Sequence, residues 1–146
     1  MTTTDFTTTI LTDRSPKEVF DAITHVRGWW QGEITGSTDK LHDEFTYRYG
    51  DIHYSKQKLV EVIPDKKIVW LVTESQLNFL QEKNEWNNTK IVFEISKAHD
   101  KTQLRFTHLG LAPEIECYDA CSTAWGELIR KSLFSLITTG KGVKVF

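Results

Sequence analysis

The chain has 146 residues, a net charge of -2 at pH 7, and 39% hydrophobic against 26% charged residues. This length and composition predict one folded domain over residues 1–146. The weak negative charge gives no basic face for nucleic acid, and no stretch stays apolar for long enough to span a membrane. The N-terminal sequence MTTTDFTTT has neither the basic nor the apolar part of a signal peptide. The two cysteines, Cys117 and Cys121, suggest buried thiols rather than a disulfide framework, so we expect a reduced, cytoplasmic setting.

The first two elements are a strand and a short helix. Residues 5–12 are rich in threonine and β-branched side chains, which favours a strand. Ser15 then occupies the position of an N-cap, with Pro16 at the first helical position and Glu18 three residues after the cap. This spacing is that of a capping box, so it predicts a helix that begins at Pro16. A second short helical piece is expected before Gly32.

Apolar and polar residues alternate from about residue 33 to residue 109, which is typical of strands. Turn residues divide this region at Gly50-Asp51, at Pro64-Asp65-Lys66 and at His99-Asp100. Residues 75–90 are polar and rich in asparagine, so they predict a mobile loop near one edge of the sheet.

The last predicted element is a long helix. Apolar residues keep a helical period from Pro113 to Gly140, which predicts a helix of about 25 residues and about 38 Å. A run of strands with segregated helices indicates an α+β domain with an antiparallel sheet. A strongly curved sheet closed over one long helix would leave a cavity between the two.

Aromatic residues are numerous, with five Trp, four Tyr and eight Phe. Most of them fall on elements that would surround this cavity. Those near loops suit its mouth, and they are Trp29, Trp30, Phe79 and Trp86. For Trp70 and Phe93, a place in the ordinary core is an equal alternative. The residues expected to line a ligand site are Trp29, Trp30, Phe45, Tyr47, Tyr54, Trp70, Glu74, Phe79, Trp86, Phe93, His108, Cys121, Trp125 and Ile129.

Two of these residues are candidates for acid–base chemistry. Glu74 is in register with Trp70 and Val72, and an inward carboxylate in an apolar pocket would have a raised pKa. The favoured alternative is that Glu74 reaches solvent. His108 follows Phe106 in the strand alternation, so it is a candidate polar anchor or proton donor. The favoured alternative is a hydrogen-bonded core histidine.

The sequence gives little support for metal, cofactor or phosphate binding. It contains no HExxH, CxxC or GxSxG motif and no glycine-rich phosphate loop. Cys117 and Cys121 lie four residues apart on the predicted helix, and a tetrahedral metal site would need further ligands beside them and His108. We therefore expect two reduced, buried thiols without metal.

Several segments together resemble the helix-grip superfamily, which is also called START-like or SRPBCC. The C-terminal third is most similar to the branch named after the activator of Hsp90 ATPase homologue 1. The segments that carry the resemblance are FTHLGL at 106–111, WGEL at 125–128, LITTGKG at 136–142, SPKEVF at 15–20, VEVIP at 60–64 and IVW at 68–70. The resemblance implies a curved antiparallel sheet wrapped around a long C-terminal helix, with two short helices after the first strand.

The resemblance also implies a cavity that holds lipids, sterols, polyketides or plant hormones, and some members of the superfamily are cyclases or hydrolases. Three hypotheses follow. The first is a module, monomeric or homodimeric, that binds a hydrophobic or aromatic small molecule without a cofactor. The second is a cyclase or hydrolase of a polyketide-like substrate that uses Glu74 or His108. The third is a chaperone-linked interaction domain, which the absence of a separate chaperone-binding domain disfavours.

Overall fold

Seven antiparallel strands form one sheet in the computed structural model, which describes residues 5–81, 83–112, 116 and 118–145. The strand order is β1-β7-β6-β5-β4-β3-β2, so neighbours in the sheet follow one another in the chain except where β1 pairs with β7. The strands are β1 (Phe6–Thr12), β2 (Glu33–Gly36), β3 (Glu44–Tyr49), β4 (His53–Ile63), β5 (Lys67–Leu77), β6 (Lys90–Ala98) and β7 (Lys101–Leu109).

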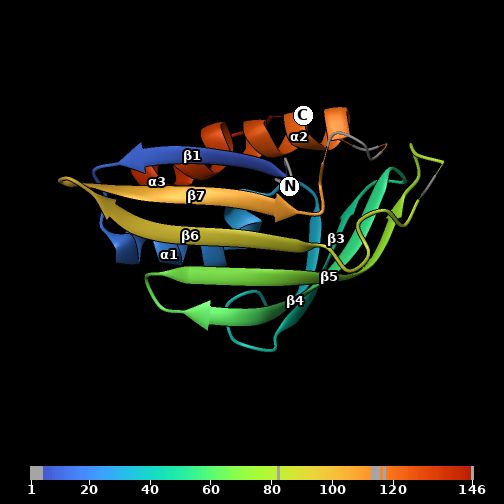
Figure 1. Cartoon of the computed structure of the whole chain (residues 1–146), viewed down its shortest axis with the longest axis horizontal. Coiled ribbons are helices and arrows are strands. Elements are labelled where there is room, and N and C mark those ends of the chain that lie inside the picture. Colours follow the sequence, from blue (N-terminus) through green and yellow to red (C-terminus); the bar gives the residue numbers. More distant parts are fainter. Residues whose placement is uncertain (1–4, 82, 113–115, 117, 146) are drawn as a thin grey trace, which may run out of the picture.

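The helices all lie on one side of the sheet (Figure 1). They are α1 (Pro16–Thr24), the short 3-10 helix η1 (Val26–Gly28), α2 (Tyr118–Glu127), the π-helical segment η2 (Leu128–Leu133) and α3 (Phe134–Thr139). The last three follow one another without a break and make one C-terminal helix of 22 residues. The predicted helix-grip architecture is therefore confirmed, although the predicted start at Pro113 lies outside the described residues.

The ends of the helices follow the sequence signals. Oγ of Ser15 accepts a hydrogen bond from the Glu18 backbone at 3.1 Å, and Glu18 accepts one from the Ser15 backbone at 3.1 Å. Two otherwise unpaired N–H groups are thereby satisfied, which is the capping box that the sequence predicts. The C-terminal helix ends at Gly140, whose φ of 87° lies in the left-handed region that glycine adopts without strain.

A β-bulge at Thr73 changes the direction of the side chains that follow it. Lys56 pairs with Glu74 but Gln57 pairs with Val72, so Thr73 is an extra residue in β5. One extra residue reverses the two-residue alternation. Val72 therefore faces the interior, whereas Glu74 is exposed on the outer face. The hypothesis of an inward carboxylate is wrong, and the alternative that Glu74 reaches solvent is confirmed.

The predicted loop over residues 75–90 is also corrected. β5 continues to Leu77, and β6 begins at Lys90. Turns occupy most of the described residues between the two strands. Leu80 and Trp86 are buried there, 8% and 3% exposed, so this segment packs against the core.

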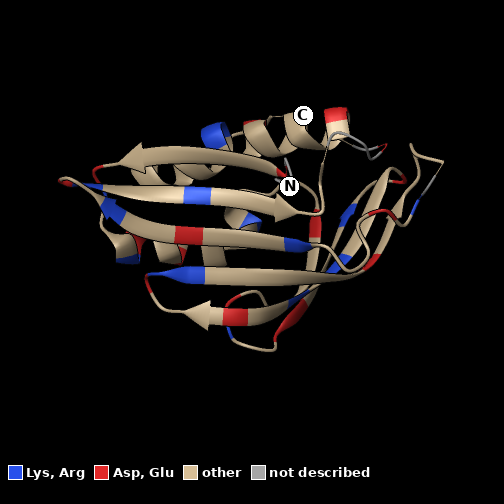
Figure 2. Cartoon of the chain, in the orientation of Figure 1, with Lys and Arg blue, Asp and Glu red and all other residues tan. Residues whose placement is uncertain are grey.

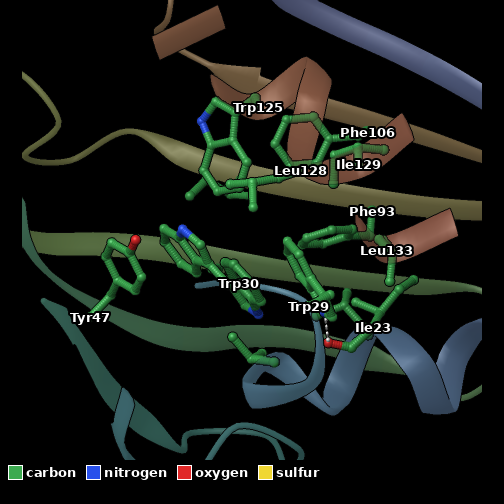
Figure 3. Packing of buried hydrophobic residues seen from close by; sticks show 14 of the residues in the cluster. Ile23, Trp29, Trp30, Tyr47, Phe93, Phe106, Trp125, Leu128, Ile129 and Leu133 are labelled. Atoms are coloured by element: carbon green, nitrogen blue, oxygen red, sulfur yellow. Dashed lines mark hydrogen bonds between the residues drawn. The ribbon is translucent and has the colours of Figure 1, made fainter. Parts of the chain in front are cut away.

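The densest part of the core is a set of aromatic rings between sheet and helices. Trp29 stacks on Trp70 with ring centroids 6.3 Å apart, and Phe93 meets both rings edge-on. The indole N–H of Trp29 donates to the carbonyl of Ile23 at 3.2 Å, which ties the segment after α1 to that helix (Figure 3). The prediction that Trp29 lies at the cavity mouth is wrong, because this ring belongs to the core.

None of the helices in the described part of the chain is long and apolar enough to cross a membrane.

Candidate ligand-binding cavity

An apolar cavity of about 200 Å³ lies between the inner face of β3 and β4 and the first turns of the C-terminal helix. Its walls come from four parts of the chain: the segment after η1, the β3–β4 hairpin, the β5–β6 connection and the C-terminal helix. The lining residues are Trp30, Tyr47, Tyr49, Ile52, His53, Phe79, Trp86, Ala120, Cys121, Ala124, Trp125 and Leu128.

Flat aromatic rings form most of the cavity wall. Trp30 stacks on Tyr47 with centroids 3.9 Å apart, and Trp125 lies 5.0 Å from Trp30. Trp86 stacks against the other side of the site, 5.8 Å from Trp125. In Figure 3, Trp125 and Leu128 point from the C-terminal helix toward Trp30 and Tyr47. Such rings provide large apolar surfaces with few rotatable bonds, so the walls are largely preformed.

Two residues at the cavity expose large apolar side chains to solvent. Ile52 is 52% exposed in the β3–β4 turn, and Phe79 is 45% exposed after β5. Isolated exposed apolar residues are common, but these two lie at the same cavity. They mark its mouth.

The helical wall of the cavity includes small side chains. Ala120 and Ala124 lie one helical turn apart and both line it. The next segment, η2, is held against the floor by Ser132, whose hydroxyl donates to the Trp29 carbonyl at 2.7 Å. This hydrogen bond ties the C-terminal helix to the segment that carries Trp29 and Trp30.

A row of polar side chains runs inward from the cavity along β4. His53, Ser55 and Gln57 alternate with outward-facing residues, and the last two have no exposed surface. The Gln57 amide donates to Oγ of Ser55 at 2.5 Å, and Ser55 lies 3.0 Å from Nε2 of His53. The row is therefore one connected hydrogen-bond chain that ends at the cavity wall.

Burial changes the acid–base properties of the polar groups at the cavity. It lowers the pKa of His53 to about 3, so the imidazole is neutral at physiological pH. It also raises the pKa of Tyr47, whose hydroxyl donates to the backbone carbonyl of Gln31. Both groups can take part in hydrogen bonds, but neither supplies a charge.

His108 is a fully paired core residue. Its Nδ1 accepts a hydrogen bond from the indole of Trp125 at 3.1 Å, since an indole N–H can only donate. Its Nε2 lies 2.8 Å from Oγ1 of Thr89, whose own proton goes to the Trp86 carbonyl at 2.6 Å. His108 is therefore the neutral Nε2–H tautomer. The favoured interpretation as a hydrogen-bonded core histidine is confirmed, and the residue is not part of the cavity lining.

Six of the predicted site residues do line the cavity, and eight lie elsewhere. Those at the cavity are Trp30, Tyr47, Phe79, Trp86, Cys121 and Trp125. Buried in the core away from it are Trp29, Phe45, Trp70, Phe93, His108 and Ile129. Tyr54 and Glu74 lie on the outer face, where the Tyr54 hydroxyl donates to the Glu74 carboxylate at 3.4 Å. The ring of Tyr54 also packs under Arg48.

The sequence prediction missed half of the lining. Tyr49, Ile52, His53, Ala120, Ala124 and Leu128 were not expected there. In β4 the wrong set of alternate residues was expected to face inward. Tyr54 shares the outer face with Lys56 and Lys58, whereas the inward-facing residues that begin at His53 are unusually polar. The lysines were the signal that Tyr54 faces outward. The alanines on the helix carry no such signal. They line the cavity because their small side chains leave space unfilled, and a sequence pattern does not show this.

The cysteine prediction is corrected in part. Cys121 is buried in the cavity wall, and its sulfur is disulfide-bonded, so the expectation of a reduced thiol at this position is wrong. The chain's other cysteine, Cys117, lies outside the described residues. Among the residues that the structure describes, no group of three or more His, Cys, Asp or Glu side chains could hold a metal ion.

The fold is that of a helix-grip protein, and a family comparison narrows the class. The model of the family described as "Activator of Hsp90 ATPase homolog 1-like protein" matches residues 13–137. The chain belongs to this family. A search of curated proteins finds no match.

Solved structures share the fold over nearly the whole chain. The Aha1 dimer from Colwellia psychrerythraea is 24% identical with a TM-score of 0.74, and the alignment covers 94% of this chain and 98% of that one. CalU16 from Micromonospora echinospora is 13% identical with a TM-score of 0.64, covering 92% and 76%. DynU16, a protein of the dynemicin biosynthetic locus, is 13% identical with a TM-score of 0.66, covering 94% and 49%. At these identities the likeness concerns the fold.

Proposed function

We propose that the protein binds a small apolar aromatic molecule in the cavity between β3, β4 and the C-terminal helix. The observation that carries the proposal is an open, preformed space whose walls are mostly stacked aromatic rings. The atoms that line an empty apolar cavity lack van der Waals partners, so an aromatic ligand would gain dispersion contacts on several sides. Because the walls are preformed, binding would cost little conformational entropy of the protein.

The charge distribution supports an uncharged ligand. Acidic and basic residues are interspersed over strands and turns (Figure 2), and among the described residues that line the cavity none is Lys, Arg, Asp or Glu. A charged group that entered would lose its hydration without gaining a counter-ion.

The cavity size favours small ligands over lipids. Its volume of about 200 Å³ exceeds the roughly 150 Å³ that admits benzene. It is below the roughly 300–1,000 Å³ of sites for drug-sized molecules. One or two fused rings fit this range better than a fatty acid or a polycyclic polyketide.

The enzyme alternative receives less support. The two residues that would act as acid or base are Glu74, which is exposed on the outer face, and His108, whose ring nitrogens are both paired. Neither lines the cavity. The aromatic lining therefore supports ligand binding and does not indicate a reaction.

Thermal unfolding tests the proposal with naphthalene as the probe. A ligand that binds only the folded state at one hundred times its Kd adds about 2.7 kcal/mol, which for a domain of this size raises Tm by several degrees. The Ala124→Leu substitution narrows the cavity from the helix and should remove most of this shift. Thr123→Leu, at an exposed position on the same helix, should keep it. Equal shifts in both variants would place the binding elsewhere.

A further inference from the structure

We propose that the ligand is a neutral one- or two-ring aromatic molecule with a hydrogen-bond acceptor, and that the Nδ1–H group of His53 binds this acceptor. The inference rests on the function proposed above. It adds the chemistry of the ligand and names the residue that orients it.

The hydrogen-bond chain along β4 sets the tautomer of His53. The Gln57 amide donates to Ser55, so the Ser55 oxygen acts as acceptor there. In the described part of the chain, the remaining neighbour for the Ser55 proton is Nε2 of His53, 3.0 Å away. Nε2 is then the acceptor, and a neutral imidazole must carry its proton on Nδ1.

The Nδ1 atom of His53 is available to a ligand. The ring lines the cavity and lies among Trp30, Tyr47 and Trp86, with centroid distances of 6.3, 5.0 and 4.7 Å. His53 is half-buried, and its hydrogen bond to Ser55 uses Nε2, so Nδ1 is the ring nitrogen left for a ligand among the described contacts.

Three other donors at the cavity are less suitable. The Tyr47 hydroxyl is bonded to Gln31, and the indole N–H of Trp125 to His108. The indole nitrogen of Trp86 has no partner but is fully buried within the wall. His53 combines an accessible donor with a fixed orientation, because Ser55 and Gln57 hold the ring from behind.

The environment of His53 selects a neutral acceptor. Three aromatic rings surround the imidazole, and the described residues that line the cavity include no Lys, Arg, Asp or Glu. Burial lowers the pKa of His53, which agrees with an uncharged donor. A carboxylate would lose its hydration on entering the cavity, and one neutral N–H donor would not compensate for that loss. A neutral ring nitrogen or carbonyl oxygen loses less hydration, so one hydrogen bond is sufficient.

The tautomer can be measured directly in the unmodified protein. Long-range 1H–15N spectra of the histidine rings at pH 7.5 should show His53 protonated on Nδ1. His108 is the internal control, because its contacts require the opposite tautomer, with the proton on Nε2. A proton on Nε2 of His53 would overturn the proposed role as donor.

A pair of matched probes tests the role in binding. Naphthalene and quinoline have the same shape, and only quinoline has an acceptor. Titration of each probe gives the ratio of the quinoline affinity to the naphthalene affinity. Because both probes make the same apolar contacts, this ratio reports the contribution of the acceptor. We expect this ratio to shift against quinoline by roughly ten-fold in His53→Phe. In this variant the quinoline nitrogen gives up its hydrogen bond to water on binding and forms no new one in the cavity. His53→Asn, which keeps a donor near the Nδ1 position, should recover part of the preference.

Tyr54→Phe is the control, because it alters the next residue of β4 on the outer face, where the ring does not line the cavity. Its affinity ratio should equal that of the wild type. If both probes bind and the ratio is unchanged in His53→Phe, the anchor is wrong and the apolar site stands. If neither probe binds the wild type, both the anchor and the proposed function fail.

Discussion

The Trp125→Ala substitution should lower the free energy of unfolding by about 3–5 kcal/mol, which is the range for removing a large buried aromatic side chain. Trp125 is 2% exposed and lies 4.7 Å from Phe106 and 5.0 Å from Trp30. Its indole also donates to Nδ1 of His108, so truncation leaves a buried acceptor unpaired. The loss is a large part of the 5–15 kcal/mol by which a typical domain is stable.

Urea unfolding measures this effect, and a second variant separates its causes. Trp125→Phe keeps much of the ring volume but removes the N–H, so its loss should fall between zero and that of Trp125→Ala. If alanine cost no more than a few tenths of a kcal/mol, Trp125 would not be packed against the sheet as described.

Acid should destabilise the fold through His108 well above the range in which carboxylates titrate. Burial lowers the pKa of His108 to about 3, with a smaller contribution from nearby His53, whereas an unfolded histidine titrates near 6.5. Between these values the unfolded chain binds the proton more readily, so stability is complete above about pH 6.5 and falls as pH decreases. By pH 5 the loss from this one residue is about 2 kcal/mol.

Denaturant titrations at pH 7, 6 and 5 measure the slope. His108→Gln should remove about 1.2 kcal/mol from the change in stability between pH 6 and pH 5, because glutamine does not titrate. His99→Asn is the control, since His99 is exposed in the β6–β7 turn and its φ of 60° suits asparagine. A slope that His108→Gln leaves unchanged would contradict the buried, neutral state of this residue.

Local sequence signals predicted the fold well. The capping box at Ser15, the turns at Asp65 and His99, and the glycine stop at Gly140 each depend on residues close together in the chain. Because such signals set element ends independently of tertiary contacts, they placed the early helix and the long strand pairs correctly. The order of elements then identified the superfamily.

The site was harder to predict because its geometry depends on register. Because of the bulge at Thr73, Glu74 lies on the outer face and not on the inner face that a regular strand would give it. No residue type at this position indicates a bulge from the sequence. At His53 the difficulty was different, because polar residues occupy inward positions where apolar ones are expected. A buried polar row became interpretable only once its hydrogen bonds to Ser55 and Gln57 were known.

The most direct test of the cavity as a binding site is the response of the five indole N–H signals to saturating naphthalene in 1H–15N spectra. The signals of Trp30, Trp86 and Trp125, which line the cavity, should shift strongly, whereas those of core Trp29 and Trp70 should change least. Saturable binding that leaves the three cavity signals unmoved, or that moves Trp29 and Trp70 more, would contradict the assignment of the ligand to this cavity.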